Sequence, residues 1–120
     1  MNNSSSADVL FTVKGEGIIE AEDFRVWPNP FKTGTSFTIR HNQSGKVIKT
    51  EIRIYNSEGK LQRVLHSTSG TDQGIIGPVQ WDGTNENGQK LETGVYIFQV
   101  ILQNEYGNNA IRNCKVMILN

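Results

Sequence analysis

Apolar and polar residues alternate along much of the chain, in short runs separated by turn-forming residues. The alternation is clear in Ser36–His41 and again in Val47–Asn56, where isoleucine stands at positions 48, 52 and 54. Successive side chains of a β-strand point to opposite faces, so this pattern predicts strands with one buried and one solvated face. No window of ten or more residues shows the 3.6-residue apolar period of a helix.

Eight runs are predicted to form strands, and clusters of glycine, proline, asparagine and aspartate bound them. They are Val9–Val13, Phe24–Trp27, Ser36–His41, Val47–Asn56, Lys60–Ser67, Ile75–Trp81, Val95–Gln103 and Ile111–Leu119. All connections are short enough for antiparallel neighbours. The sequence therefore predicts an all-β fold, an antiparallel β-sandwich of about seven to eight strands.

The stretch Trp81–Val100 joins a polar loop to the most continuously apolar run. Within Val95–Leu102 only Gln99 is polar, which predicts a central strand covered on both faces. The loop contains Asp82-Gly83 and Asn87-Gly88, residue types that tolerate positive φ and suit sharp turns.

Proline marks two further features. Pro28-Asn29-Pro30 predicts a rigid corner between strands, followed by an anchoring Phe31, because proline lacks an N–H and restricts its predecessor. Pro78 interrupts Ile75–Trp81 and places that strand at a sheet edge or a bulge. Both tryptophans, Trp27 and Trp81, are expected in the core, with Trp81 closing one end of the sandwich.

Charge narrows the class of protein. Lysine plus arginine number 12 and aspartate plus glutamate number 12, so the net charge is zero. A neutral chain lacks the basic surface of a nucleic-acid binder, and no nucleic-acid partner is expected. No apolar run approaches about 18 residues, so we expect no transmembrane segment. Residues 1–7 are interpreted as a flexible tail, not a signal peptide, and residues 8–120 as one folded domain.

The sequence predicts no catalytic residue, metal site or cofactor. His41 and His66 lie on separate strands without cysteine or carboxylate at ligand spacing, and we expect both at surface positions. Cys114, the single cysteine, alternates with Val116 and Ile118, which favours a small apolar residue on the inward face over a nucleophile.

The oxygen-rich loop Asp82–Gly88 is superficially like a cation loop. Counted from Asp82, the EF-hand pattern asks for glycine at the sixth position and glutamate at the twelfth, where this chain has Asn87 and Thr93. We expect Asp82 instead to accept backbone hydrogen bonds within its own turn.

Four short motifs occur in order over about residues 24–120, namely Val26–Phe31, Ile52–Leu61, Gly94–Val100 and Lys115–Asn120. Together they resemble the C-terminal sorting domains of the Bacteroidetes type IX secretion system. Val26-Trp-Pro-Asn-Pro-Phe31 resembles the family's Tyr-Pro-Asn-Pro-Phe entry, and Ile52–Leu61, with Gly59, resembles its Gly-Lys hairpin. Gly94-Val-Tyr-Ile-Phe-Gln-Val100 resembles its Gly-x-Tyr strand, and Lys115–Asn120 resembles its terminal stretch of lysine and apolar residues.

One departure is informative. Short sorting domains usually lack the Trp-Asp-Gly loop, which resembles the Ig-like domain of the flagellar hook-cap protein FlgD. The long form present here is most similar to the C-terminal domain of the sortase-like component of that secretion system. Cys114 matches no nucleophile motif, so any peptidase chemistry would belong to a different domain of the parent protein.

The resemblance implies an Ig-like sandwich that acts as a non-catalytic sorting or docking domain. It implies export from the periplasm to the outer membrane or cell surface, with the outer-membrane translocon and its shuttle protein as partners. The residues expected to maintain the fold are Pro28, Asn29, Pro30, Gly59, Trp81, Asp82, Gly83, Gly94 and Tyr96.

The residues expected to bind the partner are those of the last strand, Lys115, Val116, Met117, Ile118, Leu119 and Asn120. No segment follows this strand to cover it, so Met117 and Leu119 are expected to present an apolar edge. Two alternatives stay open. One is a FlgD-like module for assembly or adhesion that meets its partner through the Trp81–Gly94 loop, and the other is an accessory sandwich that binds carbohydrate or calcium.

Overall fold

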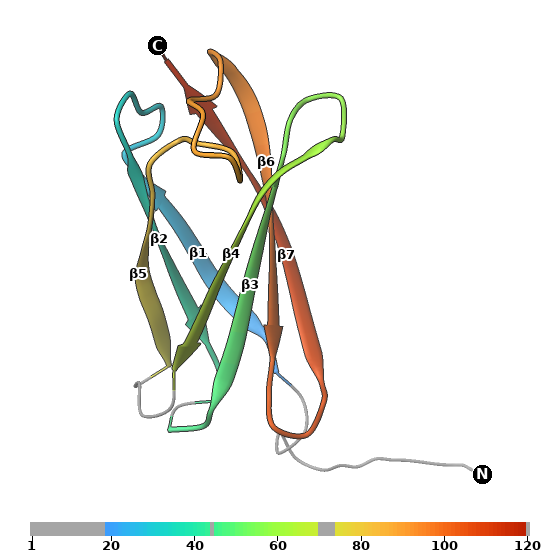
Figure 1. Cartoon of the computed structure of the whole chain (residues 1–120). Coiled ribbons are helices and arrows are strands. Elements are labelled where there is room, and N and C mark those ends of the chain that lie inside the picture. The colour runs from blue at the N-terminus through green and yellow to red at the C-terminus, as the bar shows by residue number, and fades with distance from the viewer. Residues whose placement is uncertain (1–18, 44, 70–73, 120) are drawn as a thin grey trace, which may run out of the picture.

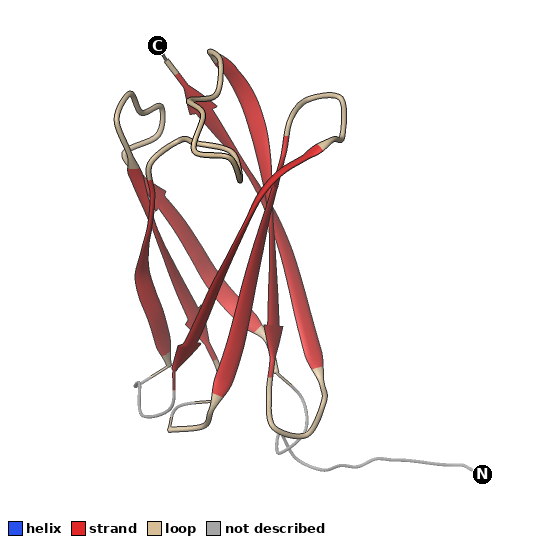
Figure 2. Cartoon of the chain, in the orientation of Figure 1, coloured by secondary structure: helices blue, strands red, loops and turns tan. Residues whose placement is uncertain are grey.

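The computed structural model describes residues 19–43, 45–69 and 74–119, which form seven strands and no helix (Figures 1 and 2). The strands are β1 (Ala21–Trp27), β2 (Thr35–His41), β3 (Ile48–Tyr55), β4 (Leu61–Ser69), β5 (Ile75–Trp81), β6 (Gly94–Gln103) and β7 (Asn109–Ile118). The predicted strand Val9–Val13, the predicted tail at residues 1–7 and Asn120 lie outside the described residues. The other seven predicted strands are confirmed.

Two antiparallel sheets face each other, which confirms the β-sandwich. One sheet has the order β1-β2-β5 and the other β4-β3-β6-β7. Strand β6 lies between β3 and β7, as its apolar sequence predicts, but the expectation that both of its faces are covered is wrong. Only the inward face is buried, while residues 95, 97, 99 and 101 stay partly or largely exposed because, in the described part of the chain, no third layer packs on the outer face. Strand β5 lies at an edge, and its pairing with β2 shifts between Phe37 and Ile39, opposite Pro78. Proline cannot donate a hydrogen bond to the ladder, which explains why this strand has both the predicted edge position and the predicted bulge.

The core lies between the inward faces of the two sheets. Isoleucines 48, 52 and 54 of β3 are buried, and so are the alternate residues 96, 98, 100 and 102 of β6. A line of rings crosses this core, with centroids 6.1 Å apart for Phe24 and Phe37, 4.4 Å for Phe37 and Phe98, and 5.4 Å for Phe98 and Trp81. Trp81 is 2% exposed and lies in the core, as predicted.

Two sequence predictions about side-chain position are wrong. Trp27 is 77% exposed, because Phe24 and Val26 pack against the core and Trp27 therefore points to the opposite face of β1. His41 is 3% exposed, because it continues the inward face of Phe37 and Ile39. Its Nδ1 accepts a hydrogen bond from the Gln43 N–H at 3.0 Å. His66 is exposed, as predicted.

Three turns share one hydrogen-bond pattern that the sequence predictions missed. They begin at Asn56, Asn85 and Asn104 and have glycine three residues later. The Oδ1 of Asn56 accepts the N–H groups of Glu58 and Lys60, both at 2.9 Å. The same two bonds form at the other two turns. The asparagine side chain thus satisfies two backbone donors at each turn, while the glycine adopts a positive φ.

The two tryptophans allow a matched test of the core. We expect Trp81→Ala to lower the free energy of unfolding by about 3–5 kcal/mol, because a large buried ring is lost. We expect Trp27→Ala to change it by no more than about 0.5 kcal/mol, because the Trp27 ring is exposed. Urea denaturation followed by circular dichroism measures both, and similar losses in the two variants would contradict the assigned positions.

Candidate functional site

The predicted partner-binding residues lie at the end of β7, which is an edge strand of the four-stranded sheet. Alternate side chains in this segment point to opposite faces of the sheet. Val116 and Ile118 are each 1% exposed and face the core, so they hold the strand and cannot meet a partner. Met117 and Leu119 are each 37% exposed on the other face. Lys115 is also exposed there, and Asn120 lies outside the described residues.

The expectation that nothing covers this edge is wrong. Asn29 Nδ2 donates to the carbonyl oxygen of Lys115 at 3.1 Å, and the Met117 N–H donates to Asn29 Oδ1 at 3.0 Å. The Phe31 N–H donates to the Met117 carbonyl oxygen at 3.0 Å, and the Leu119 N–H donates to the Phe31 carbonyl oxygen at 2.8 Å. The segment Pro28–Phe31 therefore runs beside the end of β7, with a parallel bridge between Phe31 and Ile118. We call this segment the β7 cap.

The core fixes the position of the β7 cap. Phe31 is 3% exposed, and its ring centroid lies 5.5 Å from that of Trp81. Gly83, at φ 82°, leaves room for the Phe31 ring, since a Cβ at that position would lie 3.2 Å from it. The Thr35 hydroxyl donates to the Pro28 carbonyl oxygen at 2.7 Å. Phe31 is thus the anchor that the sequence predicts.

The opposite edge of the same sheet, β4, is also covered at this end of the molecule. The Glu86 N–H donates to the Gln62 carbonyl oxygen at 3.1 Å, and Glu86 Oε2 accepts the Val64 N–H at 2.7 Å. Arg63 of β4 donates to Thr84 Oγ1 at 2.7 Å. The Trp81–Gly94 loop therefore caps β4 as Pro28–Phe31 caps β7. In Figure 1 both loops lie at the end of the sandwich that holds the C-terminus.

In the oxygen-rich loop Asp82–Gly88, the Asp82 carboxylate accepts hydrogen bonds within its own turn. Asp82 Oδ1 accepts the Thr84 N–H at 3.1 Å and its hydroxyl at 2.6 Å, which confirms the predicted turn. The hydrogen bond from the Thr84 hydroxyl holds the pKa of the Asp82 carboxyl below its ordinary value. Within residues 19–43, 45–69 and 74–119, no group of three or more histidine, cysteine or acidic side chains is arranged to hold a metal ion.

The remaining predicted residues have structural places. The Tyr96 hydroxyl donates to the Glu92 carbonyl oxygen at 2.8 Å, and burial raises the pKa of this phenol. Gly59 has φ 84° in the β3–β4 turn, and Gly94 begins β6. Cys114 shares the inward face of β7 with Val116 and is half-buried. Burial raises the pKa of the Cys114 thiol, which disfavours the thiolate that a nucleophile needs.

A group of exposed apolar side chains lies on the outer face of the β6–β7 pair. Val95, 39% exposed, pairs directly with Met117, and Leu119 follows along the chain. The next cross-strand pair on this face is Ile97 with Lys115. We call Val95, Met117 and Leu119 the outer patch.

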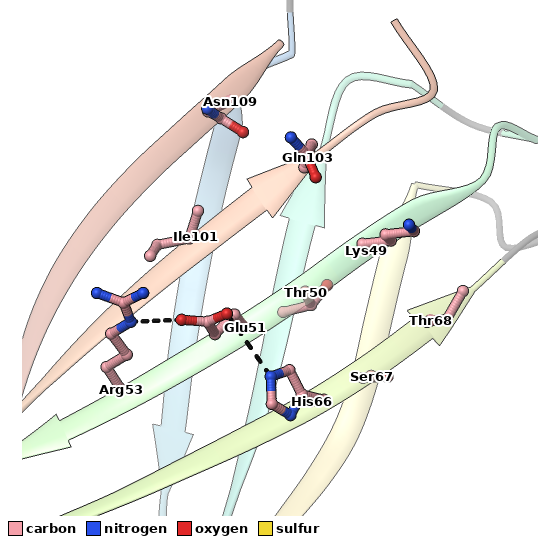
Figure 3. A pocket seen from close by; sticks show the side chains of 10 residues that line it. All are labelled: Lys49, Thr50, Glu51, Arg53, His66, Ser67, Thr68, Ile101, Gln103 and Asn109. Atoms are coloured by element: carbon pink, nitrogen blue, oxygen red, sulfur yellow. Dashed lines mark hydrogen bonds and ion pairs between the residues drawn. The ribbon is translucent and has the colours of Figure 1, made fainter. Parts of the chain in front are cut away.

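A second feature of this face is a shallow polar hollow of about 290 Å³ further down the sheet (Figure 3). One oxygen of the Glu51 carboxylate, Oε2, accepts a hydrogen bond from Arg53 Nε. The other oxygen, Oε1, lies 3.6 Å from His66 Nε2. The side chains of Gln103 and Asn109 lie at its rim (Figure 3). Ser67 and Thr68 also line the hollow, which the sequence predictions did not mark.

Two facing antiparallel sheets of three and four strands define an Ig-like β-sandwich, and loops cap both edge strands of the larger sheet at one end. A family model for the FlgD Ig-like domain matches residues 27–105, which is more than half of the chain. The chain belongs to the FlgD Ig-like domain family. No helix among the residues that the structure describes is long and apolar enough to cross a membrane.

Solved structures share the fold. Dimeric latent PorU from Porphyromonas gingivalis matches with a TM-score of 0.77 and 24% identity, over 89% of this chain and 10% of PorU. FlgD from Xanthomonas campestris, whose structure concerns hook capping in flagellar assembly, matches with a TM-score of 0.58 and 14% identity, over 83% of this chain and 67% of that one. This chain therefore spans about a tenth of the length of PorU. A comparison with curated proteins finds no match.

The β7 cap can be tested through Asn29. We expect Asn29→Ala to lower the free energy of unfolding by about 1–3 kcal/mol, because a backbone donor and a backbone acceptor lose their partner. Asn87→Ala is the control, since Asn87 is an exposed loop asparagine for which we expect a change within about 0.5 kcal/mol. Chemical denaturation measures both. Equal stability of the two variants would show that the cap contributes nothing.

Proposed function

We propose that the domain is a non-catalytic C-terminal signal and docking domain. It directs or holds its parent protein at the outer-membrane machinery of the type IX secretion system. The single observation that carries this proposal is the outer patch on the β6–β7 pair, held in place by a buried inner face and a capped edge. The ordered sequence motifs and the shared fold with part of PorU support it.

The proposed partners are the outer-membrane translocon and its shuttle protein, and the proposed location is outside the inner membrane, from the periplasm to the cell surface. Any peptidase activity of the parent protein resides in another domain. Val116 and Ile118 in the core give the strand a fixed position, so the outer patch is preorganised and loses little conformational entropy on docking.

The size of the outer patch limits what it contributes. Fully burying an apolar side chain of this size contributes about 1.5–3 kcal/mol. Each patch residue is exposed by 37–39%, so covering it contributes about 0.5–1 kcal/mol. Because association itself costs at least about 4 kcal/mol, the patch acts as the centre of a larger interface.

The outer patch can be tested with a fused passenger. We expect the double variant Met117→Asp and Leu119→Asp to reduce surface delivery of the passenger at least about tenfold, because charge would be buried against the partner. Ile111→Asp is the control, since Ile111 is 55% exposed on the same face of β7 but far from the patch. Surface proteolysis of whole cells measures delivery.

These substitutions are cleaner than removing Lys115–Asn120, because that deletion also removes the buried Val116 and Ile118 from the core. Thermal denaturation of the purified variants checks that they fold. Normal delivery of a folded double variant would refute docking through the outer patch.

The family match favours a second function, a structural module for assembly of the FlgD type. Its partner would meet the Trp81–Gly94 loop. Asn85 and Glu86 are engaged in the loop and in the β4 cap, so substituting them would disturb the fold. Asn87 is the better probe, because its side chain is exposed at the loop tip.

This alternative predicts that Asn87→Arg blocks incorporation of the parent protein into its surface assembly, while the Met117 and Leu119 double variant is incorporated normally. Fractionation of the cell envelope measures incorporation. The docking proposal expects the reverse pattern, so one set of variants separates the two functions.

A further inference from the structure

The β7 cap supplies the hydrogen bonds of a neighbouring strand. In an antiparallel ladder the backbone groups of alternate residues point away from the partner, and on β7 these belong to Lys115, Met117 and Leu119. The four groups from the Lys115 carbonyl to the Leu119 N–H all have partners in the cap. The Asn29 amide provides one donor and one acceptor, as a peptide unit would.

We propose that the β7 cap closes the end of the terminal strand, Lys115–Leu119, to strand addition, so that a docking partner recognises the outer patch and not this part of the strand edge. This inference rests on the proposed docking function and specifies how the partner is recognised. Strand addition needs a free row of backbone donors and acceptors, and Asn29 and Phe31 already occupy the part of that row from Lys115 to Leu119.

The cap does not exchange readily for an incoming strand. Phe31 bonds to Met117 and Leu119 through its backbone, while its side chain lies in the core against Trp81. A competing strand would have to withdraw a 3% exposed phenylalanine from the sandwich. The Lys115–Leu119 part of the edge therefore stays closed in the folded domain.

The outer patch indicates the chemistry of the partner. Its three apolar side chains require an apolar surface opposite them. Lys115 projects from the same face of β7 and forms no ion pair with any residue in the described part of the chain. A protein surface with apolar side chains and a carboxylate facing Lys115 fits both features.

The closed edge is tested first in solution. Asn29→Ala frees the Lys115 carbonyl and the Met117 N–H, so we expect this variant to self-associate through β7 while the unaltered chain stays monomeric at the same concentration. Asn56→Ala is the matched control, because it also loses two backbone hydrogen bonds at an exposed turn but opens no edge. Light scattering after size exclusion measures the mass. An Asn29→Ala variant that is folded and as monomeric as Asn56→Ala would overturn the cap.

Delivery of a fused passenger then separates recognition by the patch from recognition by the edge. We expect at least a tenfold loss for Lys115→Glu and for the Met117 and Leu119 double variant, and no gain for Asn29→Ala. A gain with Asn29→Ala, together with normal delivery of both patch variants, would assign recognition to the edge. That result would refute this inference and leave the docking function standing. Unchanged delivery of all of them would refute the docking function itself.

Discussion

The edge strands of an open sheet present backbone donors and acceptors that need hydrogen-bond partners, and the rest of this structure depends on how that need is met. At one end of the four-stranded sheet, both edges meet this need through loops. Asn29 serves β7 with its side-chain amide, and Glu86 serves β4 with its backbone N–H and its carboxylate. Each residue offers one donor and one acceptor, which is what one residue of an added strand would offer. The two loops thus supply the hydrogen bonds of a neighbouring strand without adding a strand to the sheet.

Trp81 connects the two caps. Its ring packs against Phe31, which continues the cap of β7. Its indole N–H donates to the Thr84 carbonyl oxygen at 3.0 Å, which orients the loop that carries Glu86 to β4. Arg63 of β4 also reaches the Thr84 hydroxyl. One buried side chain therefore links the aromatic core to both edges. This explains why the proline corner and the Trp-Asp-Gly loop, far apart in sequence, form one structural unit.

Short apolar runs bounded by turn residues predict the seven described strands. The continuous apolar run of residues 95–102 predicts the central place of β6, and Pro78 predicts the edge place of β5. The errors arose where an expectation about residue type displaced the alternation. Phe24 and Val26 already place Trp27 on the outer face, and Phe37 and Ile39 already place His41 inside. The edge caps could not be predicted, because Asn29 and Lys115 are 86 positions apart and a side chain that imitates a peptide group leaves no periodic signal.

The capped edge also bears on how far family membership can specify function. The FlgD Ig-like match ends at residue 105, so it contains both capping loops but stops before β7. The shared part is therefore the frame that closes the edges, and the outer patch lies mostly on the strand beyond it. In such a domain the inner face of the last strand packs in the core, and the backbone groups at the end of its edge already have hydrogen-bond partners. Only the outer face is then free to vary without cost to the fold. In this chain that face holds Met117 and Lys115, so our proposal places specificity for a partner there and not in the motifs that define the family.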